Sequence, residues 1–288
     1  MRFSIFRCTF CRQIKDKNMP ESTPSPILLC IGGHDPCGGA GIQADAEAAR
    51  ATGVHAASVI SCLTSQDSCG MHAYWPQPEG RVDKQCRMIL ADSQVNAVKI
   101  GLLGSSRITR AVSQLADEHP DLPWILDPVL TSGVGDTFMD AALVNQLRKN
   151  LLGRCTLTTP NLPEARTLSG AKEPDDCAAR LLESGCRWIL ITGTHADSKD
   201  VVNRLYGQDG SRQEWSWPRL PYEYHGSGCT LASAIAARLA KGIDMQSAAK
   251  DAQAFTWHSL QHAWRTGRCQ LTPNRMFVLD APQSDEDP

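Results

Sequence analysis

From residue 27 onward, the sequence alternates short apolar, β-branched segments with amphipathic segments of helical length. This alternation is typical of βαβ units that build a parallel sheet covered by helices. The predicted strands cover residues 27–32, 55–62, 97–102, 124–127, 155–159 and 188–192. The predicted helices between them cover residues 42–52, 80–92, 106–118, 139–151, 163–168 and 175–183. The sequence therefore predicts an α/β fold.

The alternation changes near residue 200. Residues 201–206 and 213–217 flank a turn at residues 208–211, which predicts an antiparallel hairpin at one edge of the sheet. Two further helices are expected, one from about residue 228 to about residue 240 and the other over residues 245–264, because apolar and small residues recur there at helical spacing.

The 288 residues could form two domains, but α/β folds of this size are often one unit. We therefore predict one domain over residues 27–280, with an N-terminal extension at 1–26 and an acidic tail at 281–288 that are expected to be disordered. Residues 1–18 are basic and unpatterned, and a Pro/Ser/Thr-rich stretch follows Met19, which makes Met19 an alternative start. The extension has no apolar segment of the kind found in secretory signals.

Charge and hydropathy favour a small-molecule partner. The net charge is -2, with Lys and Arg spread through the chain, so the sequence indicates no basic surface for nucleic acid or for an anionic membrane. No window approaches the roughly 18 consecutive apolar residues of a membrane-spanning helix. These features predict a cytoplasmic protein that binds neither nucleic acid nor membrane.

The cysteine pattern argues against a disulfide framework. Several of the 12 cysteines lie inside apolar segments, where a small thiol packs as core: Cys30, Cys62, Cys155 and Cys186. Cys8 and Cys11 form a lone CxxC without a second pair or a histidine cluster. We interpret this pair as a coincidence rather than as a zinc site.

The most informative motif is the segment HGSGC at residues 225–229, where a glycine-rich turn runs directly into a helix of small residues. Glycines let the backbone approach an oxyanion closely, and the free N–H groups and dipole of a helix N-terminus favour phosphate. The motif therefore predicts an anion-binding loop formed by Gly226, Ser227 and Gly228. The alternative is an ordinary start of a helix that happens to contain glycines.

Cys229 lies in the first turn of that helix. The helix dipole and nearby cations are expected to lower the pKa of this thiol toward the thiolate. Such a cysteine would activate a substrate hydroxyl beside a bound phosphate. Two alternatives stay open: a Cys229/His225 nucleophilic pair of a hydrolase, and a buried structural cysteine.

A second glycine-rich motif, GGHDPCGGAGIQAD, covers residues 32–45, between the first predicted strand and the first predicted helix. Its spacing differs from the GxGxxG of dinucleotide-binding loops, and an acidic Asp45 one turn into the helix would repel a pyrophosphate. A substrate-binding loop is the better interpretation. The glycines would let a flat ring approach, and Asp45 would accept a hydrogen bond or a proton from a hydroxyl group.

Acidic groups follow two predicted strands. Asp127 belongs to the segment LDPVL and Glu164 to the segment TPNLPE, both at the carboxyl edge where α/β sheets bind ligands. Mg²⁺ takes one or two carboxylates, often through water, together with phosphate oxygens. Asp127 and Glu164 are therefore candidate magnesium residues, although either acid alone would more often be a helix cap or a surface group.

Four motifs, GGHDPCGGAGIQAD, DPVLTSG, TPNLPEA and HGSGCTLASA, occur in the order and spacing of the phosphomethylpyrimidine kinases, over roughly residues 27–277. The chain thus resembles this family, and pyridoxal kinases share its general architecture. The resemblance implies a ribokinase-like three-layer αβα sandwich with a mostly parallel central sheet and an antiparallel hairpin at one edge. It also implies ATP and Mg²⁺ as cofactors, a homodimer, and two substrates that meet at the carboxyl edge of the sheet.

The resemblance implies roles for residues on the pyrimidine side of the site. Gly33 and Asp45 would meet the hydroxymethyl group of the pyrimidine, and Gln66 would bind the amino edge of its ring. Leu102 and Val129 would line the ring.

The same resemblance implies roles on the phosphate side. The anion hole for the transferring phosphoryl group would be formed by Gly226, Ser227, Gly228 and Cys229, with the cysteine at the place of the aspartate base of sugar kinases. Mg²⁺ and its waters would be organised by Asp127, Asn161 and Glu164. The ATP-binding residues would be Asn161, Thr192, Gly193 and Gly228.

One position departs from the family pattern. Many members carry Lys-Gly-Gly-His where this chain has Thr-Gly-Thr-His, so Thr192 replaces a phosphate-binding lysine. A hydroxyl group donates one hydrogen bond, but it cannot neutralise the charge of a phosphoryl transition state. The departure puts rate and substrate choice in question, not the fold.

The resulting prediction is an ATP-dependent kinase that phosphorylates 4-amino-5-hydroxymethyl-2-methylpyrimidine and its monophosphate, giving the diphosphate used to build thiamine. A pyridoxal kinase is the nearest alternative, and Gln66, which suits an aminopyrimidine edge, argues against it. A non-catalytic pyrimidine-binding sensor is a second alternative, which Thr192 keeps open. The sequence does not decide whether both phosphorylation steps are retained.

Overall fold

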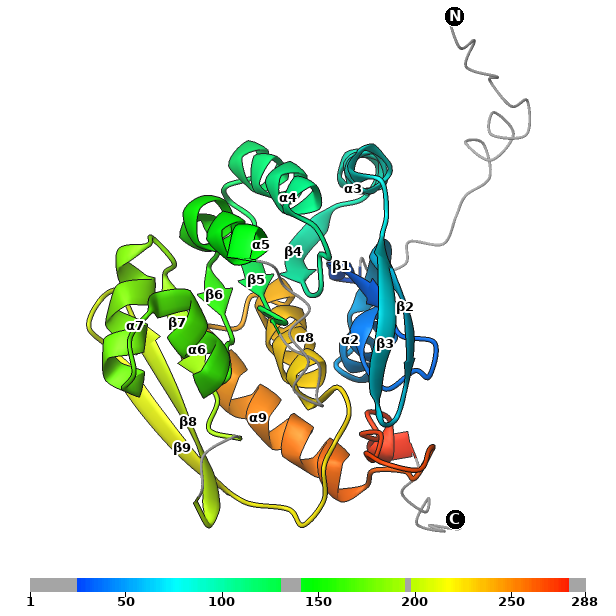
Figure 1. The fold of residues 1–288 in the computed structure, drawn as a ribbon, viewed down its shortest axis with the longest axis vertical. Coiled ribbons are helices and arrows are strands. Elements are labelled where there is room, and N and C mark those ends of the chain that lie inside the picture. Colours follow the sequence, from blue (N-terminus) through cyan, green and yellow to red (C-terminus); the bar gives the residue numbers. More distant parts are fainter. Residues whose placement is uncertain (1–24, 131–140, 195–197, 280–288) are drawn as a thin grey trace, which may run out of the picture.

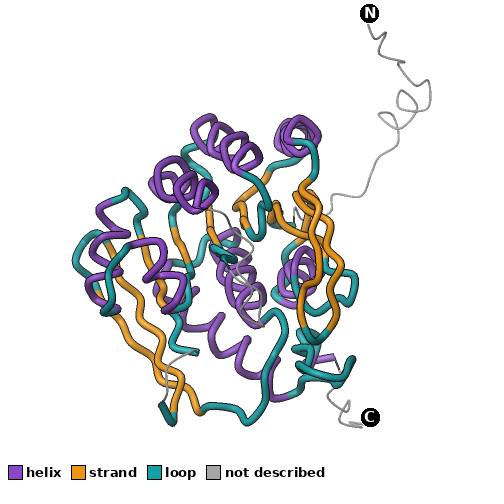
Figure 2. The backbone as a smooth tube through the Cα atoms, viewed as in Figure 1, coloured by secondary structure: helices purple, strands orange, loops and turns teal. Residues whose placement is uncertain are grey.

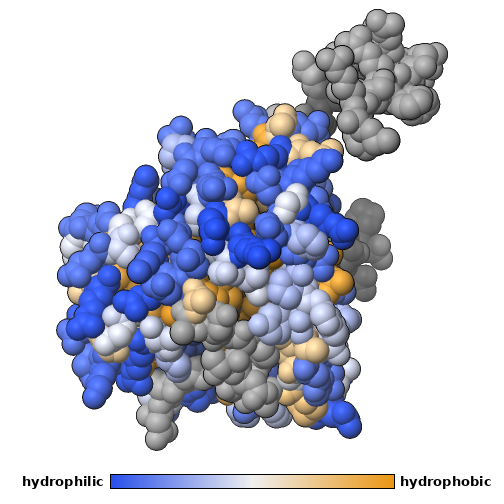
Figure 3. Space-filling model, turned by 45° about the horizontal axis from the view of Figure 1, so that its top comes forward, coloured by the Kyte–Doolittle hydropathy of each residue, from blue (hydrophilic) through white to orange (hydrophobic). Residues whose placement is uncertain are grey.

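The computed structural model describes residues 25–130, 141–194 and 198–279. Several sequence predictions concern residues outside these ranges, namely Cys8 and Cys11, Met19, residues 131–133 of the DPVLTSG motif, His195 and the tail at 281–288. In the described part of the chain, each helix is too short or too polar to cross a bilayer. The face seen in Figure 3 is mostly hydrophilic, with apolar residues in small groups.

A nine-stranded sheet forms the centre of the molecule, with the strand order β3-β2-β1-β4-β5-β6-β7-β8-β9. The six strands from β2 to β7 in this order pair in parallel. At the two edges β3, β8 and β9 pair antiparallel. The strands are β1 (Ile27–His34), β2 (His55–Asp67), β3 (Gly70–Pro76), β4 (Val95–Ile100), β5 (Trp124–Leu126), β6 (Leu157–Thr158), β7 (Trp188–Ile191), β8 (Asp200–Gly207) and β9 (Arg212–Pro218).

Helices cover both faces of the sheet and give three layers (Figures 1 and 2). One face carries α2 (Gly41–Ala51), α8 (Ser227–Ala240) and α9 (Met245–Gln261). The other face carries α3 (Glu79–Asp92), α4 (Ser106–Glu118), α5 (Ala141–Gln146), η1 (Leu147–Leu151), η2 (Leu152–Arg154), α6 (Leu162–Ser169) and α7 (Pro174–Glu183). A short 3₁₀ turn, η3 (Phe277–Leu279), ends the described chain.

Two hydrophobic cores lie between the layers, because successive residues of a strand point to opposite faces. In β1, Leu29 and Ile31 pack under the helices α3 to α7. Leu28 and Cys30 of the same strand pack under α2, α8 and α9. A strand buried on both faces needs a continuous apolar sequence, which explains why the β1 sequence shows no polar alternation.

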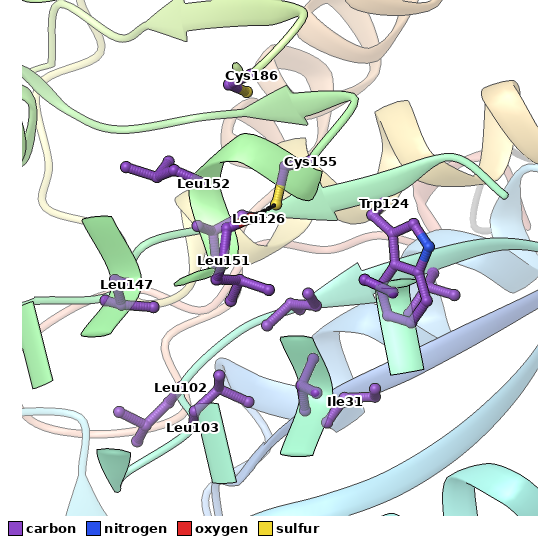
Figure 4. Close-up of a cluster of buried hydrophobic side chains, with 14 of the residues drawn as sticks. Ile31, Leu102, Leu103, Trp124, Leu126, Leu147, Leu151, Leu152, Cys155 and Cys186 are labelled. Atoms are coloured by element: carbon purple, nitrogen blue, oxygen red, sulfur yellow. Dashed lines mark hydrogen bonds between the residues drawn. The ribbon is translucent and has the colours of Figure 1, made fainter. Parts of the chain in front are cut away.

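Figure 4 shows part of the first core. Trp124 of β5 is 1% exposed and packs in the same cluster as Leu147 and Leu151 of the π-helical segment η1. Its indole nitrogen donates to the carbonyl oxygen of His119 at 3.0 Å, so the one polar atom of this ring is satisfied. Burial of each such side chain contributes roughly 1.5–3 kcal/mol to folding.

The predicted alternation of strands and helices is confirmed, and the hairpin after residue 200 is present as β8 and β9. The sequence missed β3, which pairs antiparallel with an extended β2 at the opposite edge of the sheet. Since β3 is an edge strand and is partly exposed along its length, its sequence lacks the apolar run that marks the buried strands. The predicted helix 245–264 was too long, because α9 ends at Gln261.

The buried cysteines predicted from the sequence are confirmed at positions 30, 62, 155 and 186. The structure also contains a disulfide between Cys69 and Cys269, which the sequence analysis did not expect. The two residues are 200 positions apart in the chain. They meet because the fold places the turn between β2 and β3 beside the C-terminal segment, a proximity that residue spacing alone does not reveal.

The order of the strands indicates where a ligand can bind. β1 is flanked by β2 on one side and by β4 on the other, so the chain connections diverge at β1. In open α/β sheets such a point leaves a crevice outside the carboxyl ends of the strands. The glycine-rich residues 32–41 and the start of the connection from β4 to α4, at Gly101 and Leu102, lie at this place.

Candidate active site

A cavity of about 610 Å³ opens at the carboxyl ends of the central strands. Both glycine-rich motifs and the residues after β4, β5 and β6 form its walls. The predicted site residues that line it are Gly33, Asp45, Gln66, Leu102, Asp127, Val129, Asn161, Glu164, Thr192, Gly226, Ser227, Gly228 and Cys229. The structure therefore brings together residues from every motif named in the sequence.

Gly193 is the one predicted residue that is absent from the walls of this cavity. It is buried, its N–H donates to Asn203 Oδ1 at 3.0 Å, and a Cβ at this position would clash with the carbonyl oxygen of Val202. Gly193 thus packs against β8 instead of offering its amide to a ligand. Its glycine identity is explained by this close backbone contact.

Asp45 is fully buried at the start of α2, and its two oxygens differ. Oδ1 accepts a hydrogen bond from Lys99 Nζ at 2.7 Å and another from Ser233 Oγ at 2.7 Å. Oδ2 has no hydrogen-bond partner among the described residues. A buried carboxylate oxygen without a hydrogen bond costs free energy. This oxygen is therefore available to accept a hydrogen bond from a ligand.

Lys99 compensates the charge of the site. Its ammonium group is fully buried on β4 and lies 2.7 Å from Asp45 and 3.7 Å from Asp127 Oδ2. Burial alone would lower the pKa of Lys99, but the nearby carboxylates of Asp45 and Asp127 raise it on balance. The lysine therefore stays charged and offsets the carboxylates that surround it.

The predicted anion loop opens α8. Gly226 occupies the N-cap position with a left-handed φ of 82°, and its carbonyl oxygen accepts from the Thr230 N–H at 3.0 Å. A Cβ on Gly226 would clash with the carbonyl oxygen of Gly39, and a Cβ on Gly39 would clash with the His225 ring. The two glycine-rich motifs thus pack closely against each other, Gly226 against the Gly39 backbone and Gly39 against the His225 ring, which explains why both positions need glycine.

A contact between the Asp35 carboxyl group and the His225 ring joins the same two motifs. Asp35, which is fully buried, lies 2.9 Å from His225 Nε2 through its Oδ2 atom. Oδ2 also accepts from the N–H of Ala40 at 2.7 Å, and Oδ1 accepts from the N–H of Cys37 at 3.0 Å. Although burial raises the pKa of Asp35, hydrogen bonds from His225 and Cys37 lower it on balance. The His225 ring therefore binds Asp35 and links the two loops. This contact argues against the hydrolase alternative, in which His225 would activate Cys229.

The expected low pKa of Cys229 is wrong. Burial raises the pKa of this thiol to about 12, and the opposing effect of Lys99 is offset by Asp127 and Asp45. The helix dipole is thus weaker here than desolvation and two nearby carboxylates. Cys229 rests as a neutral thiol.

Asp127 and Glu164 form an acidic cluster after β5 and β6. Burial raises the pKa of Asp127, with Lys99 acting in the opposite direction. Burial and the neighbouring Asp127 raise the pKa of Glu164 to about 8. Asp127 Oδ2 and Thr159 Oγ1 are buried atoms without a hydrogen-bond partner in the described structure. Carboxylate and hydroxyl oxygens such as these are the ligands that a hard divalent cation prefers.

Asn161 and Glu164 also form a capping box at the start of α6. Asn161 Oδ1 accepts from the Glu164 N–H at 2.9 Å, and Glu164 Oε2 accepts from the Asn161 N–H at 2.9 Å. Glu164 Oε1 accepts from the Leu130 N–H at 3.3 Å. The helix-cap interpretation is therefore confirmed for Glu164, which faces the cavity with both oxygens already receiving one hydrogen bond.

Another wall of the cavity includes an aromatic side chain. Thr192 lines it together with Trp217 of β9 and Gln253 of α9. Gln253 Oε1 accepts from the Trp217 indole N–H at 3.1 Å and from Asn203 Nδ2 at 2.8 Å. Thr192 of this wall was predicted from the sequence as an ATP-binding residue, whereas Trp217 and Gln253 were not predicted as site residues.

Lys99, Ser233, Thr159 and Asp35 were also missed as site residues. Lys99 left a signal in the sequence, because a lysine within the apolar strand AVKI must find a buried partner or a ligand. Ser233 gave no signal, since a serine among the alanines of α8 is an ordinary small helix residue.

Comparison with known proteins agrees with this geometry. The family model described as phosphomethylpyrimidine kinase matches residues 35–274. The chain is 39% identical over 243 residues to the hydroxymethylpyrimidine/phosphomethylpyrimidine kinase of Streptomyces coelicolor, and the match covers 82% of this chain and 88% of that protein.

Solved structures show the same fold. The pyridoxal kinase of Bacillus subtilis, solved as an ADP complex, has a TM-score of 0.80 at 25% identity, covering 89% of this chain and 99% of that one. The phosphomethylpyrimidine kinase of Clostridium difficile has a TM-score of 0.71 at 29% identity, and the match covers 81% of this chain and 98% of that one. The predicted ribokinase-like fold is thereby confirmed. Since the family model spans most of the chain and the Streptomyces relative matches over nearly the same length, this chain belongs to the phosphomethylpyrimidine kinase family.

Proposed function

We propose that this protein transfers the γ-phosphoryl group of ATP to 4-amino-5-hydroxymethyl-2-methylpyrimidine and then to its monophosphate. The observation that carries the proposal is the meeting of the unpaired Asp45 Oδ2 with the Gly226 anion loop in one cavity. The first group suits a substrate hydroxyl and the second suits a phosphate. A kinase must hold both in contact with each other.

On the acceptor side, Gln66 offers an amide that both donates and accepts, which matches the amino edge of an aminopyrimidine. Leu102 and Val129 would cover the faces of the ring, and Gly33 would allow its approach. Gly33 has little spare room, because a Cβ there would come within 3.2 Å of Leu102 Cδ2. These contacts support a flat ring in this half of the cavity.

On the phosphate side, the N–H groups at the start of α8 would hold the transferring phosphoryl group. The hydroxyl proton of the acceptor would pass to Cys229, while the proton of the neutral thiol passes to Asp127. The hydrogen bond between the Cys229 thiol and Asp127 supports this route, because it gives the thiol proton a direct path to a carboxylate.

The acidic residues fit Mg²⁺, because Asp127 Oδ2 and Thr159 Oγ1 are buried without a hydrogen-bond partner among the described residues and line the same cavity as Glu164. We propose that Asp127, Asn161 and Glu164 hold the ion and its waters. Bound there, Mg²⁺ would neutralise part of the charge on the phosphate oxygens of ATP. Thr192 and the Trp217 wall would receive the nucleotide.

The test is ADP release by the purified protein with the hydroxymethylpyrimidine, its monophosphate and pyridoxal as separate acceptors. We expect the two pyrimidines to be preferred. Cys229→Ala should lower kcat by about 10²- to 10⁴-fold with little change in pyrimidine affinity. Cys229→Asp should keep part of the rate, because a carboxylate can accept the proton. Cys186→Ala, at a buried thiol outside the cavity, is the matched control. A folded Cys229→Ala with the parent rate would exclude the proton route.

Pyridoxal is a second candidate acceptor, because the pyridoxal kinase of Bacillus subtilis superposes with a TM-score of 0.80. Preference for pyridoxal over both pyrimidines would replace the proposed substrate and leave the kinase chemistry in place. ATP turnover that no acceptor stimulates would instead favour the binding-only alternative.

We also propose a cytoplasmic homodimer in which residues 27–280 form one kinase domain. Support for a dimer comes from the β2–β3 edge, where Leu63 pairs across the strands with Trp75 and the two are 41% and 55% exposed. Such an apolar pair on an edge hairpin is a natural contact between two copies. Trp75→Lys should shift the mass measured by light scattering toward the monomer, whereas Trp264→Lys, at a tryptophan that is 50% exposed elsewhere, should not.

A further inference from the structure

The segment of residues 264–275, called here the C-terminal strap, contacts three walls of the cavity. The Gln270 N–H donates to the carbonyl oxygen of Ser68 at the β2–β3 turn (3.1 Å). The His225 N–H donates to the carbonyl oxygen of Leu271 at 2.9 Å. The Asn274 N–H donates to the carbonyl oxygen of Ser259 in α9 at 3.0 Å. Figure 1 shows this red segment beside the lower ends of β3 and α2.

Arg275 ends the strap and is 1% exposed. Its guanidinium group binds three separate parts of the chain. Nε donates to Thr230 Oγ1 at 2.8 Å, Nη1 donates to Glu47 Oε2 at 2.9 Å, and Nη2 donates to the carbonyl oxygen of Gly39. A buried guanidinium is costly unless its donors are paired, and its planar fork fixes the direction of each bond.

These partners lead directly to the two glycine-rich loops. Thr230 Oγ1, which accepts from Arg275, itself donates to the carbonyl oxygen of Gly226 at 2.8 Å. Gly39 lies on the substrate loop, and its carbonyl oxygen lies so close to Gly226 that a Cβ on Gly226 would clash with it. One guanidinium therefore binds both loops at the place where they touch, from a residue that lies outside either motif.

We propose that Arg275 is a positioning residue for phosphoryl transfer. It holds the Gly39 carbonyl directly and the Gly226 carbonyl through Thr230, so that the acceptor and the anion loop stay aligned. The inference rests on the proposed function and adds a residue to it. A displacement of about 1 Å between reacting groups can cost roughly 100-fold in rate, whereas each ligand still binds its own half of the cavity.

The test compares Arg275→Ala and Arg275→Lys with the parent, using whichever acceptor in the panel the parent phosphorylates. We expect Arg275→Ala to lower kcat by about 10- to 100-fold. The separate affinities for the acceptor and for ATP should change by less than about threefold, since each loop keeps its own ligand contacts. Arg275→Lys should recover only part of the rate, because an ammonium group cannot span Thr230 and Gly39 together. Arg87→Ala, which breaks surface ion pairs with Asp83 and Glu118, is the control for the loss of an arginine.

Chemical rescue separates positioning from a general loss of stability. Methylguanidinium at low millimolar concentration should restore part of the rate of Arg275→Ala and leave the parent unaffected. Should the Arg275 variants not fold, Thr230→Val and Thr230→Ser test the same link. The serine keeps the hydroxyl between Arg275 and Gly226 and should retain the rate, whereas the valine should lose it.

The outcomes distinguish this inference from the proposed function. A folded Arg275→Ala with the parent kcat, or a Thr230→Val as active as Thr230→Ser, would overturn the positioning role. A parent that phosphorylates pyridoxal and neither pyrimidine would overturn the proposed substrate. The kcat values of the Arg275 variants would then be compared with pyridoxal as the acceptor. A melting temperature that falls while kcat per folded molecule stays constant would show a structural role only.

Discussion

Glu164 is a carboxyl group whose pKa is raised from 4.5 to about 8, chiefly by burial. An acid with a raised pKa in the folded state holds more protons there than in the unfolded state between those two values. The free energy of unfolding must therefore fall as the pH rises from about 4.5 to about 8, by up to about 1.4 kcal/mol per pH unit from this group. This loss reflects the cost of a buried charge without a cation beside it.

Glu164→Gln should remove that part of the pH dependence. Urea unfolding of the parent and the variant at several pH values between 5 and 8, without Mg²⁺, measures the difference between their slopes. We expect the difference to shrink when Mg²⁺ is added, because a bound cation stabilises the charged carboxylate. Equal slopes in the absence of Mg²⁺ would show that Glu164 titrates near its ordinary value.

Gln66 provides a second prediction at the scale of a single residue. Gln66→Leu leaves the amino edge of the pyrimidine without a partner, which should cost about 1–3 kcal/mol of binding energy. Calorimetry should show this loss for the pyrimidine, whereas the affinity for ATP should stay close to that of the parent. Equal losses for both ligands would contradict a direct contact and point to a role in folding the β2 edge.

At the scale of an element, the start of α8 depends on Gly226. This residue has a φ of 82°, and a Cβ there would clash with the Gly39 carbonyl. Gly242, which follows the same helix, has a φ of 79°, and a Cβ added to it would meet no heavy atom within 4 Å. The two glycines therefore share the backbone strain but not the close contact.

We expect Gly226→Ala to lower kcat by about 100-fold or more, because the anion loop and the substrate loop must separate. Gly242→Ala should cost only stability, about 1 kcal/mol, from the left-handed backbone. Steady-state rates and thermal melting of both variants measure the contrast. Similar rates for the two variants would mean that the contact between the loops does not matter for catalysis.

At the scale of the whole molecule, the disulfide between Cys69 and Cys269 ties the β2–β3 turn to the C-terminal strap across 200 residues. A cross-link that closes so long a loop restricts the unfolded chain and typically contributes about 2–4 kcal/mol. Cys69→Ser should therefore unfold at a lower urea concentration than the oxidised parent. The parent treated with reductant should unfold with the variant, while the variant should not respond to reductant. A parent that is insensitive to reductant would contradict the cross-link in solution.

Local sequence determined the class of fold and the glycine-rich motifs that line the cavity. Strand and helix periods depend on residues a few positions apart, so the apolar run of β1 and the helical spacing of α8 are visible in the sequence alone. The motifs were found because glycine is needed wherever two backbones or a backbone and an anion come close. Strand β3 was not predicted, because an exposed edge strand does not need a continuous apolar sequence.

The tertiary structure decided the electrostatics and the alignment of the site. Lys99 lies 54 residues from Asp45 in sequence, and Arg275 lies 228 residues from Glu47, yet each pair is within 3 Å in space. The pKa of Cys229 rises rather than falls because burial, together with the carboxylates of Asp127 and Asp45, outweighs the opposing effect of Lys99, and none of these distant groups is visible in the local sequence. Charge interactions and desolvation depend on which distant groups share a cavity, and only the folded chain fixes that.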